Sequence, residues 1–249
     1  MDEKAFQELA QRAVKRGIPL FSRFLNLSEQ KMGEIAARKE GASFRFFGGK
    51  DDCERRIWGV GADGAPEEWE FPIVCLLAAP KSAHFAAPIS HRDVLGALMG
   101  LQIEREMVGD ICVRPEGAYI FCLERMAQHI MDELTQIGRT DVRCVRIEPP
   151  EGELRHTVPV RVQVSSPRLD AVVAHLFHLS RDDAQSLFRQ GRMLVDDAEC
   201  DRPDYQLKEG QIISVRRFGR ARYDGIQNTS KKGKLNVCIS LYTDETNEK

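Results

Sequence analysis

A short segment rich in proline and glycine, Pro149-Pro150-Glu151-Gly152, interrupts the chain near its middle. Proline lacks a backbone donor and fixes φ, and glycine turns freely, so neither a helix nor a strand continues through such a segment. A second loop-like stretch lies at residues 61–66. We therefore expect three domains in the 249 residues, at 1–66, 67–151 and 152–249.

The first domain is expected to be small and to mix helices with strands. Apolar residues recur at steps of three and four in residues 6–14, and this helical pattern ends before Gly17. A second helix is predicted from Ser28, as its cap, to about Glu40. Strand-like stretches follow at 42–47 and 53–60.

The middle domain shows an alternation of strand and helix patterns. In chain order we expect a strand at 71–79, a helix at 91–101, strands at 108–114 and 118–123, a helix at 124–137 and a strand at 142–147. The order βαββαβ is that of a ferredoxin-like or RNA-recognition-like sandwich. Tyr119 and Phe121 alternate on the predicted third strand, so they either contact RNA or pack against a neighbouring element or partner.

Several classes of protein do not fit this sequence. No apolar run reaches the ~18 residues of a membrane span, and the acidic start at Met1-Asp2-Glu3 does not resemble a secretory signal. We expect a cytoplasmic protein. The 7 cysteines include no CxxC pair and the 6 histidines no HExxH motif, so neither a cofactor nor a metal is expected.

Basic charge is concentrated late in the chain. The whole sequence has a net charge of −2, but residues 155–234 hold 15 Lys/Arg against 10 Asp/Glu. In residues 211–234 the excess is larger, with seven basic residues and one acidic residue, Asp224. An excess of this kind on one domain is typical of a nucleic-acid-binding surface.

A row of polar side chains is predicted on one helix of the third domain. A helix from Ser166-Pro167 is followed by a second one capped by Ser180, and a short strand follows Gly191. If the second helix runs through Arg192, then Arg181, Gln185, Arg189 and Arg192 share one stripe, and an apolar stripe lies beside it. Guanidinium groups in a row suit phosphates, although a solvated helix face has the same pattern.

Other basic residues of the third domain strengthen the binding interpretation. Arg168 lies at the expected start of the first helix, where backbone N–H groups also favour an anion. Phe218 and Tyr223 are interleaved with basic residues and could stack on an exposed base. The complete predicted RNA-binding set is Arg168, Arg181, Gln185, Arg189, Arg192, Lys208, Arg216, Arg217, Arg220, Arg222, Lys231, Lys232 and Lys234.

About fifty residues of the third domain resemble the S-four RNA-binding domain, a module named for a small-subunit ribosomal protein. The resemblance lies in Arg168-Leu169-Asp170, Ser180-Arg181, Gly191 to Asp196 and Gly210 to Val215, in this order and spacing. It implies that the two helices and the strands after them form the RNA surface. Matched residue by residue, it assigns contacts to Arg168, Arg181, Gln185, Arg189, Arg192 and Lys208.

Nearly the whole chain resembles the YlmH-type proteins. The residues concerned are Phe46 to Gly49 with Glu54 to Arg56, His91 to Gly100 with Gly109 to Ile111, and Arg217 to Arg220 with Thr229 to Lys234. The resemblance implies binding to ribosomal RNA and tRNA on the large ribosomal subunit. It also implies a role in quality control of stalled nascent chains or in cell division.

Two other functions stay open. S-four domains are often fused to pseudouridine synthases, whose catalytic aspartate lies in a Gly-Arg-Leu-Asp motif similar to Pro167 to Asp170 here. A methyltransferase would need a glycine-rich turn, and Gly59 to Gly64 is the nearest candidate, although Pro66 and acidic residues follow it. The alternatives to an RNA-binding protein are therefore an RNA-modifying enzyme and a protein-interaction adaptor.

Overall fold

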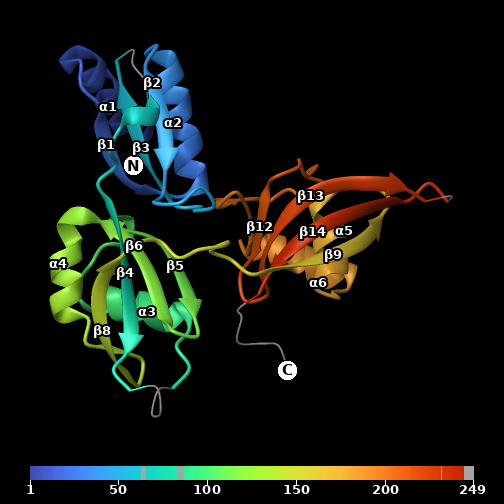
Figure 1. The fold of residues 1–249 in the computed structure, drawn as a ribbon. Coiled ribbons are helices and arrows are strands. Elements are labelled where there is room, and N and C mark those ends of the chain that lie inside the picture. Colours follow the sequence, from blue (N-terminus) through green and yellow to red (C-terminus); the bar gives the residue numbers. More distant parts are fainter. Residues whose placement is uncertain (63–65, 83–86, 231, 244–249) are drawn as a thin grey trace. The chain divides into compact units, whose positions relative to one another are not determined.

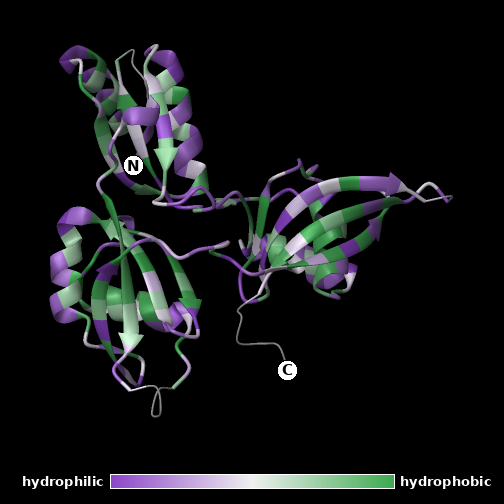
Figure 2. Cartoon of the chain, in the orientation of Figure 1, coloured by the Kyte–Doolittle hydropathy of each residue, from purple (hydrophilic) through white to green (hydrophobic). Residues whose placement is uncertain are grey.

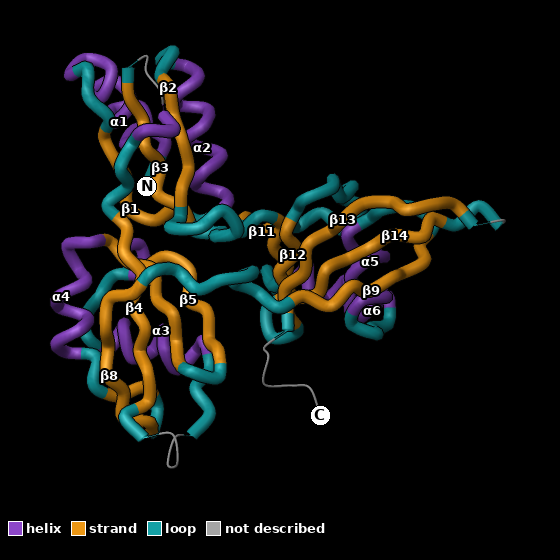
Figure 3. Tube along the Cα trace, in the orientation of Figure 1, coloured by secondary structure: helices purple, strands orange, loops and turns teal. Residues whose placement is uncertain are grey.

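The computed structural model describes residues 1–62, 66–82, 87–230 and 232–243, and it divides into two compact units, Met1–Leu154 and Arg155–Lys249. Figure 1 shows the elements in chain order, and Figure 3 separates helices from strands. Helices and antiparallel sheets occur in both units, so the α+β class expected from the sequence is confirmed.

The first unit begins with two helices packed on a three-stranded antiparallel sheet of order β1-β3-β2. Trp58 of β3 packs edge-on against Phe6 of α1, 5.5 Å between ring centroids, in a core lined by alanines of both helices. Figure 2 shows hydrophilic residues along the outer side of α2. The elements are α1 (Glu3–Arg16), β1 (Leu20–Leu25), α2 (Leu27–Lys39), β2 (Ser43–Phe47) and β3 (Arg56–Gly61).

This region differs from the sequence analysis in two ways. The strand β1 was not predicted, because its six residues lie between two helices and show no regular alternation. The cap of α2 is Asn26 and not Ser28. The Asn26 side chain accepts from Glu29 N at 2.9 Å, and the Glu29 carboxylate accepts from Asn26 N, which closes a capping box.

The rest of the first unit has the expected order βαββαβ with a short strand, β7, added. The strands form one antiparallel sheet of order β5-β6-β4-β8-β7. The predicted helix 124–137 is four residues too long, because Gln136 and Ile137 pair with β8 instead. The elements are η1 (Pro66–Glu68), β4 (Ile73–Pro80), α3 (His91–Gly100), η2 (Arg105–Met107), β5 (Val108–Arg114), β6 (Gly117–Leu123), α4 (Glu124–Glu133), β7 (Gln136–Ile137) and β8 (Thr140–Ile147).

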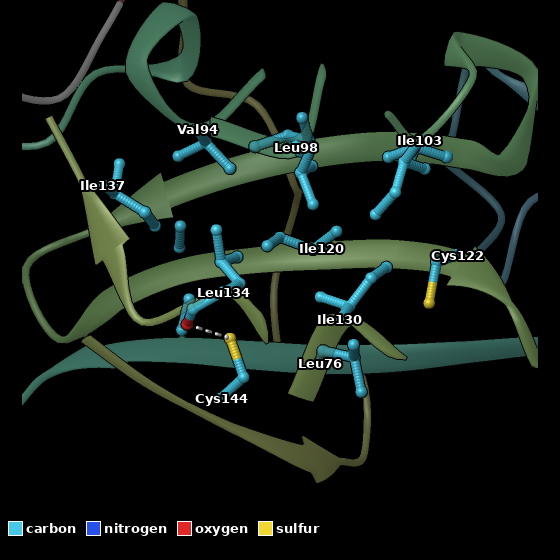
Figure 4. Packing of buried hydrophobic residues seen from close by; sticks show 14 of the residues in the cluster. Leu76, Val94, Leu98, Ile103, Ile120, Cys122, Ile130, Leu134, Ile137 and Cys144 are labelled. Atoms are coloured by element: carbon cyan, nitrogen blue, oxygen red, sulfur yellow. Dashed lines mark hydrogen bonds between the residues drawn. The ribbon is translucent and has the colours of Figure 1, made fainter. Parts of the chain in front are cut away.

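The helices α3 and α4 cover one face of this sheet. Figure 4 shows Val94 and Leu98 of α3 lying above Ile120 of β6, and Ile130 of α4 near Leu76 of β4. All five side chains are buried, so this layer is an apolar core.

Aromatic and aliphatic side chains from the N-terminal sheet cover the opposite face. Phe121 of β6 is fully buried and Tyr119 is 8% exposed, in one cluster with Phe24 and Ile57. Base stacking by Tyr119 and Phe121, one of the two interpretations of their alternation, is therefore excluded by burial. Asp110 accepts from the backbone N–H groups of Glu54 (2.6 Å) and Arg55 (3.2 Å) and so joins the two sheets.

In the stretch Gly59 to Gly64, the first two glycines belong to a strand and not to a cofactor-binding turn. Gly59 and Gly61 lie within β3, beneath the rings of Trp69 and Phe71, where a Cβ would come within about 3.0 Å of those rings. Their role is to let aromatic rings lie against the strand. Asp63 and Gly64 lie outside the described residues.

The second unit is a six-stranded antiparallel sheet of order β11-β10-β12-β13-β14-β9, with α5 and α6 packed on one face. Alternate residues of β9, β13 and β14 point to this core, and Figure 2 shows the resulting alternation of hydropathy along the strands. The elements are β9 (Thr157–Val164), α5 (Leu169–Leu176), α6 (Arg181–Arg189), β10 (Met193–Val195), β11 (Ala198–Glu199), β12 (Ile212–Val215), β13 (Gly219–Thr229) and β14 (Leu235–Tyr242).

The helices and the cysteines were also compared with what a membrane protein or a thiol-dependent protein would need. Over the described residues, no helix is both long and apolar enough to cross a membrane. Five of the seven cysteines are buried, and burial raises the pKa of the Cys122 thiol to about 12. That thiol is therefore protonated and unreactive at neutral pH.

Candidate nucleic-acid interface

Helix α6 presents the predicted polar row to solvent. The Ser180 hydroxyl caps the helix by accepting from Asp183 N at 3.1 Å. Ala184, Leu187 and Phe188 are buried against the sheet, whereas Arg181, Gln185 and Arg189 are exposed. The helix is fixed by its apolar side, so the backbone positions from which its cations project are set before any ligand binds.

The helix ends at Arg189, close to the expected end at Gly191, so the condition that placed Arg192 on the same stripe, a helix running through Arg192, is not met. Gly191 has φ of +60°, a conformation that glycine adopts without strain. Its N–H donates to Phe188 O, and Arg192 N donates to Leu187 O, which completes the helix C-terminus. Arg192 consequently leaves the helical stripe.

The side chain of Arg192 is directed to the turn between β12 and β13. Nη2 donates to the carbonyl of Arg216 at 2.8 Å, and Nη1 donates to Gln190 Oε1 at 3.2 Å. The guanidinium carbon lies 5.7 Å from the centre of the Phe218 ring. Arg192 thus joins the end of α6 to a turn that carries Arg216 and Arg217.

The start of α5 differs from the prediction in two ways. The helix begins at Leu169 with Arg168 as its N-cap, not at Ser166-Pro167. Leu169 N donates to Tyr205 O at 2.9 Å and Asp170 N to Pro203 O at 3.1 Å, so these two N–H groups already have acceptors. They are not available to an anion, contrary to the expectation for this helix N-terminus.

Arg168 is engaged with Asp170 through two hydrogen bonds, Nε to Oδ1 at 3.0 Å and Nη2 to Oδ2 at 2.7 Å. Burial alone would raise the pKa of Asp170. The hydrogen bonds from Arg168 and Ala171 N, with the charges of Arg168 and Arg181, outweigh burial and lower that pKa. The charge of Arg168 is therefore balanced by Asp170, and the pair shapes the start of α5.

Two more predicted residues lie in intramolecular ion pairs. Arg220 Nη1 donates to Asp197 Oδ1 and to Ser214 Oγ, both at 2.8 Å. Arg222 Nε donates to Asp224 Oδ1 at 2.7 Å. Arg220 is only partly exposed, so we assign it to holding the turn between β10 and β11.

The remaining predicted cations are exposed. Within the described residues none of them has an ion pair with an acidic side chain, and Lys231 lies outside those residues. Lys232 and Lys234 lie at the end of the β13–β14 hairpin, where Ser230 N donates to Lys234 O. The exposed set is Arg181, Arg189, Lys208, Arg216, Arg217, Lys232 and Lys234.

A shallow hollow lies beside the helical row. Gln185 and Arg189 line it, together with Phe188 and the carboxylates of Glu199 and Asp201. The Glu199 side chain passes over Gly191, where a Cβ would lie 2.7 Å from Oε1. The row is therefore bounded by negative charge, which restricts where a phosphate can approach Arg189.

Arg161 is an exposed arginine that the predicted RNA-binding set did not include, because the strand β9 was not predicted. Val160, Val162 and Val164 pack in the core with α5 and α6, so Arg161 projects from the opposite face of the sheet. Arg222 lies on the same face, since its neighbours Ala221 and Tyr223 are in that core. The alternation of valine with polar residues at 158–164 was the signal for this strand.

Comparison with known protein families identifies one region and several relatives. The family model described as "Putative RNA-binding domain in YlmH" matches residues 66–151. The ribosome-associated protein quality control protein P2 of Bacillus subtilis is 30% identical over 246 residues, which cover 96% of this chain and 95% of that protein.

Other matches are partial. The small ribosomal subunit protein uS4 of Macrococcus caseolyticus is 52% identical over 50 residues, 20% of this chain and 25% of that protein. An RNA pseudouridine synthase of Aquifex aeolicus is 32% identical over 75 residues, 30% of this chain and 27% of that protein. The solved structure of the cell division protein YlmH from Streptococcus pneumoniae matches with a TM-score of 0.47 and 21% identity, over 58% of this chain and 90% of that one.

Proposed function

The chain belongs to the YlmH family, and from this premise we propose that it binds structured RNA on the large ribosomal subunit without catalysing a reaction. The proposed RNA is ribosomal RNA, with tRNA as a second ligand, in the cytoplasm. The B. subtilis relative is named for ribosome-associated quality control, and we propose the same process here, with cell division as the other process that the family suggests.

One observation carries the proposal: exposed cations lie on α6 and on the β12–β13 turn, and Arg192 connects these two elements. Arg181, Arg189 and Arg216 are solvent-exposed on elements that are themselves held by an apolar core. Phosphates attract such guanidinium groups through charge and through geometry. Three to six phosphate contacts would give a slope of log K against log salt of roughly −2 to −5.

The proposed domain assignment follows from the same family. Residues 1–66 would form an N-terminal α+β domain, 67–151 a ferredoxin-like domain and 152–249 an S-four domain. The sheet order β5-β6-β4-β8 supports the second assignment, and the similarity of 50 residues to uS4 supports an S-four module in the chain.

An RNA-modifying enzyme is the alternative that a partial relative favours, because a pseudouridine synthase is similar over 75 residues. The aspartate in question, Asp170, is held by Arg168 and by Ala171 N at 2.8 Å. We assign it to shaping the start of α5. Ribosomal RNA from a strain that lacks the protein distinguishes the two functions. Pseudouridine has the same mass as uridine, so it is first labelled with a carbodiimide and then detected by mass spectrometry; a pseudouridine missing from this strain would show an enzyme.

The proposed function is tested by sedimentation of the purified protein with separated small and large ribosomal subunits in a sucrose gradient. We expect co-migration with the large subunit at low salt and release as salt rises. Migration at the top of the gradient, or with the small subunit alone, would contradict the proposal.

A further inference from the structure

Phe218 closes the turn between β12 and β13 and leaves 43% of its surface exposed. Its N–H donates to Val215 O at 2.9 Å, so Arg216 and Arg217 are the central residues of a tight turn. Arg217 has φ of +74°, at the position that a type II turn ordinarily gives to glycine. Two arginines and a phenylalanine thus occupy a turn whose backbone favours a smaller residue.

The Phe218 ring is fixed by its neighbours and does not rotate freely into solvent. It packs against Phe177, with 5.9 Å between ring centroids and a tilt of 55°. The Arg192 guanidinium lies over the ring and also holds the Arg216 carbonyl. Gly219, the next residue, has φ of +154°, and a Cβ there would come within 3.2 Å of Phe177.

Among the described residues of the second unit, Phe218 is the one aromatic side chain that is classed as exposed. Tyr223, the second aromatic residue among the basic residues, is 2% exposed and belongs to the core, so it cannot stack on a ligand. In the described part of the second unit, the other exposed large apolar side chains are Val158 and Ile226, which have no aromatic face. A flat ligand would therefore stack on Phe218.

A nucleotide supplies both groups that this turn can recognise. Its base has a flat π face, and its phosphates match the exposed guanidinium groups of Arg216 and Arg217. Bases inside a duplex are already stacked on their neighbours and do not reach a protein ring. The complementary ligand is consequently an unpaired nucleotide in a bulge, loop or junction.

We propose that Phe218 stacks on one unpaired base of the bound RNA, while Arg216 and Arg217 contact the phosphates beside that base. The proposal rests on the RNA binding proposed above. It adds a requirement for a nucleotide outside the duplex, which charge alone would not impose.

The test uses two hairpin RNAs of the same length and charge. One carries a bulged 2-aminopurine and the other an abasic residue at the same position. We expect the wild-type protein to bind the first about tenfold more tightly, the factor typical of one stacked base, and to quench its fluorescence. Equal affinity for the two hairpins would overturn the proposal.

Substitutions of Phe218 separate stacking from packing. Phe218→Leu keeps an apolar contact with Phe177 but has no π face, so it should lose the preference and keep the affinity for the abasic hairpin. Phe218→Trp should keep the preference. A preference that survives in Phe218→Leu would overturn the stacking role, whereas failure of the wild type to bind either hairpin or ribosomal RNA would overturn the proposed function as well.

Discussion

Arg220 and Asp197 form an ion pair at 2.8 Å that joins the start of β13 to the turn between β10 and β11. Asp196 and Asp197 both have positive φ in that two-residue turn, and Asp196 Oδ1 accepts from Ile212 N at 2.8 Å. Arg220 therefore supports a strained turn from the side.

This relationship predicts different effects for two arginines of the candidate interface. Arg220→Ala removes a partly buried ion pair and should lower the free energy of unfolding by about 2 kcal/mol, because Asp197 loses its partner. Arg181→Ala, at an exposed residue, should change that free energy by less than about 0.5 kcal/mol and weaken RNA binding instead. Urea titration and RNA binding of both variants check this, and equal destabilisation would contradict it.

The pair of Arg168 and Asp170 predicts an acid-dependent contribution to stability. The pKa of Asp170 is lowered in the folded protein, so its contribution is complete above its unfolded pKa of about 3.9. The contribution is lost as pH falls through the lower folded pKa. Wild type should therefore exceed Asp170→Asn in stability at pH 6, with the difference shrinking below about pH 4 in chemical denaturation. A difference that is constant with pH would argue against the pair.

The carboxylates beside Arg189 predict a gain of binding when they are neutralised. Glu199→Gln with Asp201→Asn removes negative charge from the hollow and should raise RNA affinity about threefold at low salt. The gain should disappear at high salt, where the charges are screened. Unchanged affinity in fluorescence anisotropy at low salt would show that RNA does not approach this side of α6.

The close contact between the two sheets of the first unit predicts that a methyl group added at Gly109 lowers the stability of the protein. A Cβ at Gly109 would lie 2.6 Å from the buried Phe24 ring, so Gly109→Ala should cost about 1–3 kcal/mol. Gly96→Ala is the matched control, since nothing lies within 4 Å of its Cβ and alanine favours the helix α3. Calorimetry should show a lower Tm for the first variant and an equal or higher Tm for the second.

Local sequence patterns predicted where helices and strands lie better than they predicted which elements lie side by side. The cap at Ser180, the apolar stripe and Gly191 located α6 correctly, but the helix stops before Arg192, so Arg192 does not share its polar stripe. The strand β9 was overlooked, although valines alternate with polar residues there. Periodicity reports which face is apolar, but it does not report which strand lies beside another.

Exposure at the candidate site could not be derived from the sequence. Phe218 and Tyr223 are both aromatic residues between arginines, yet one is 43% exposed and the other 2% exposed. The difference arises from the register of β13 on β14, which places Tyr223 opposite Ile239 in the core. In the same way, the ion pairs of Arg220 and Arg222 depend on side chains brought together by the sheet.

The central claim is that the exposed cations of the second unit bind the phosphates of folded RNA. The most direct measurement is the salt dependence of binding to ribosomal RNA for three proteins: wild type, Arg181→Glu with Arg189→Glu, and the control Arg12→Glu with Lys15→Glu on α1. All four residues are exposed, and both double variants change the net charge equally. The claim predicts that the α6 variant loses at least about tenfold in affinity and about 1.5 in the slope of log K against log salt, while the control matches wild type. Equal behaviour of the two double variants would contradict it.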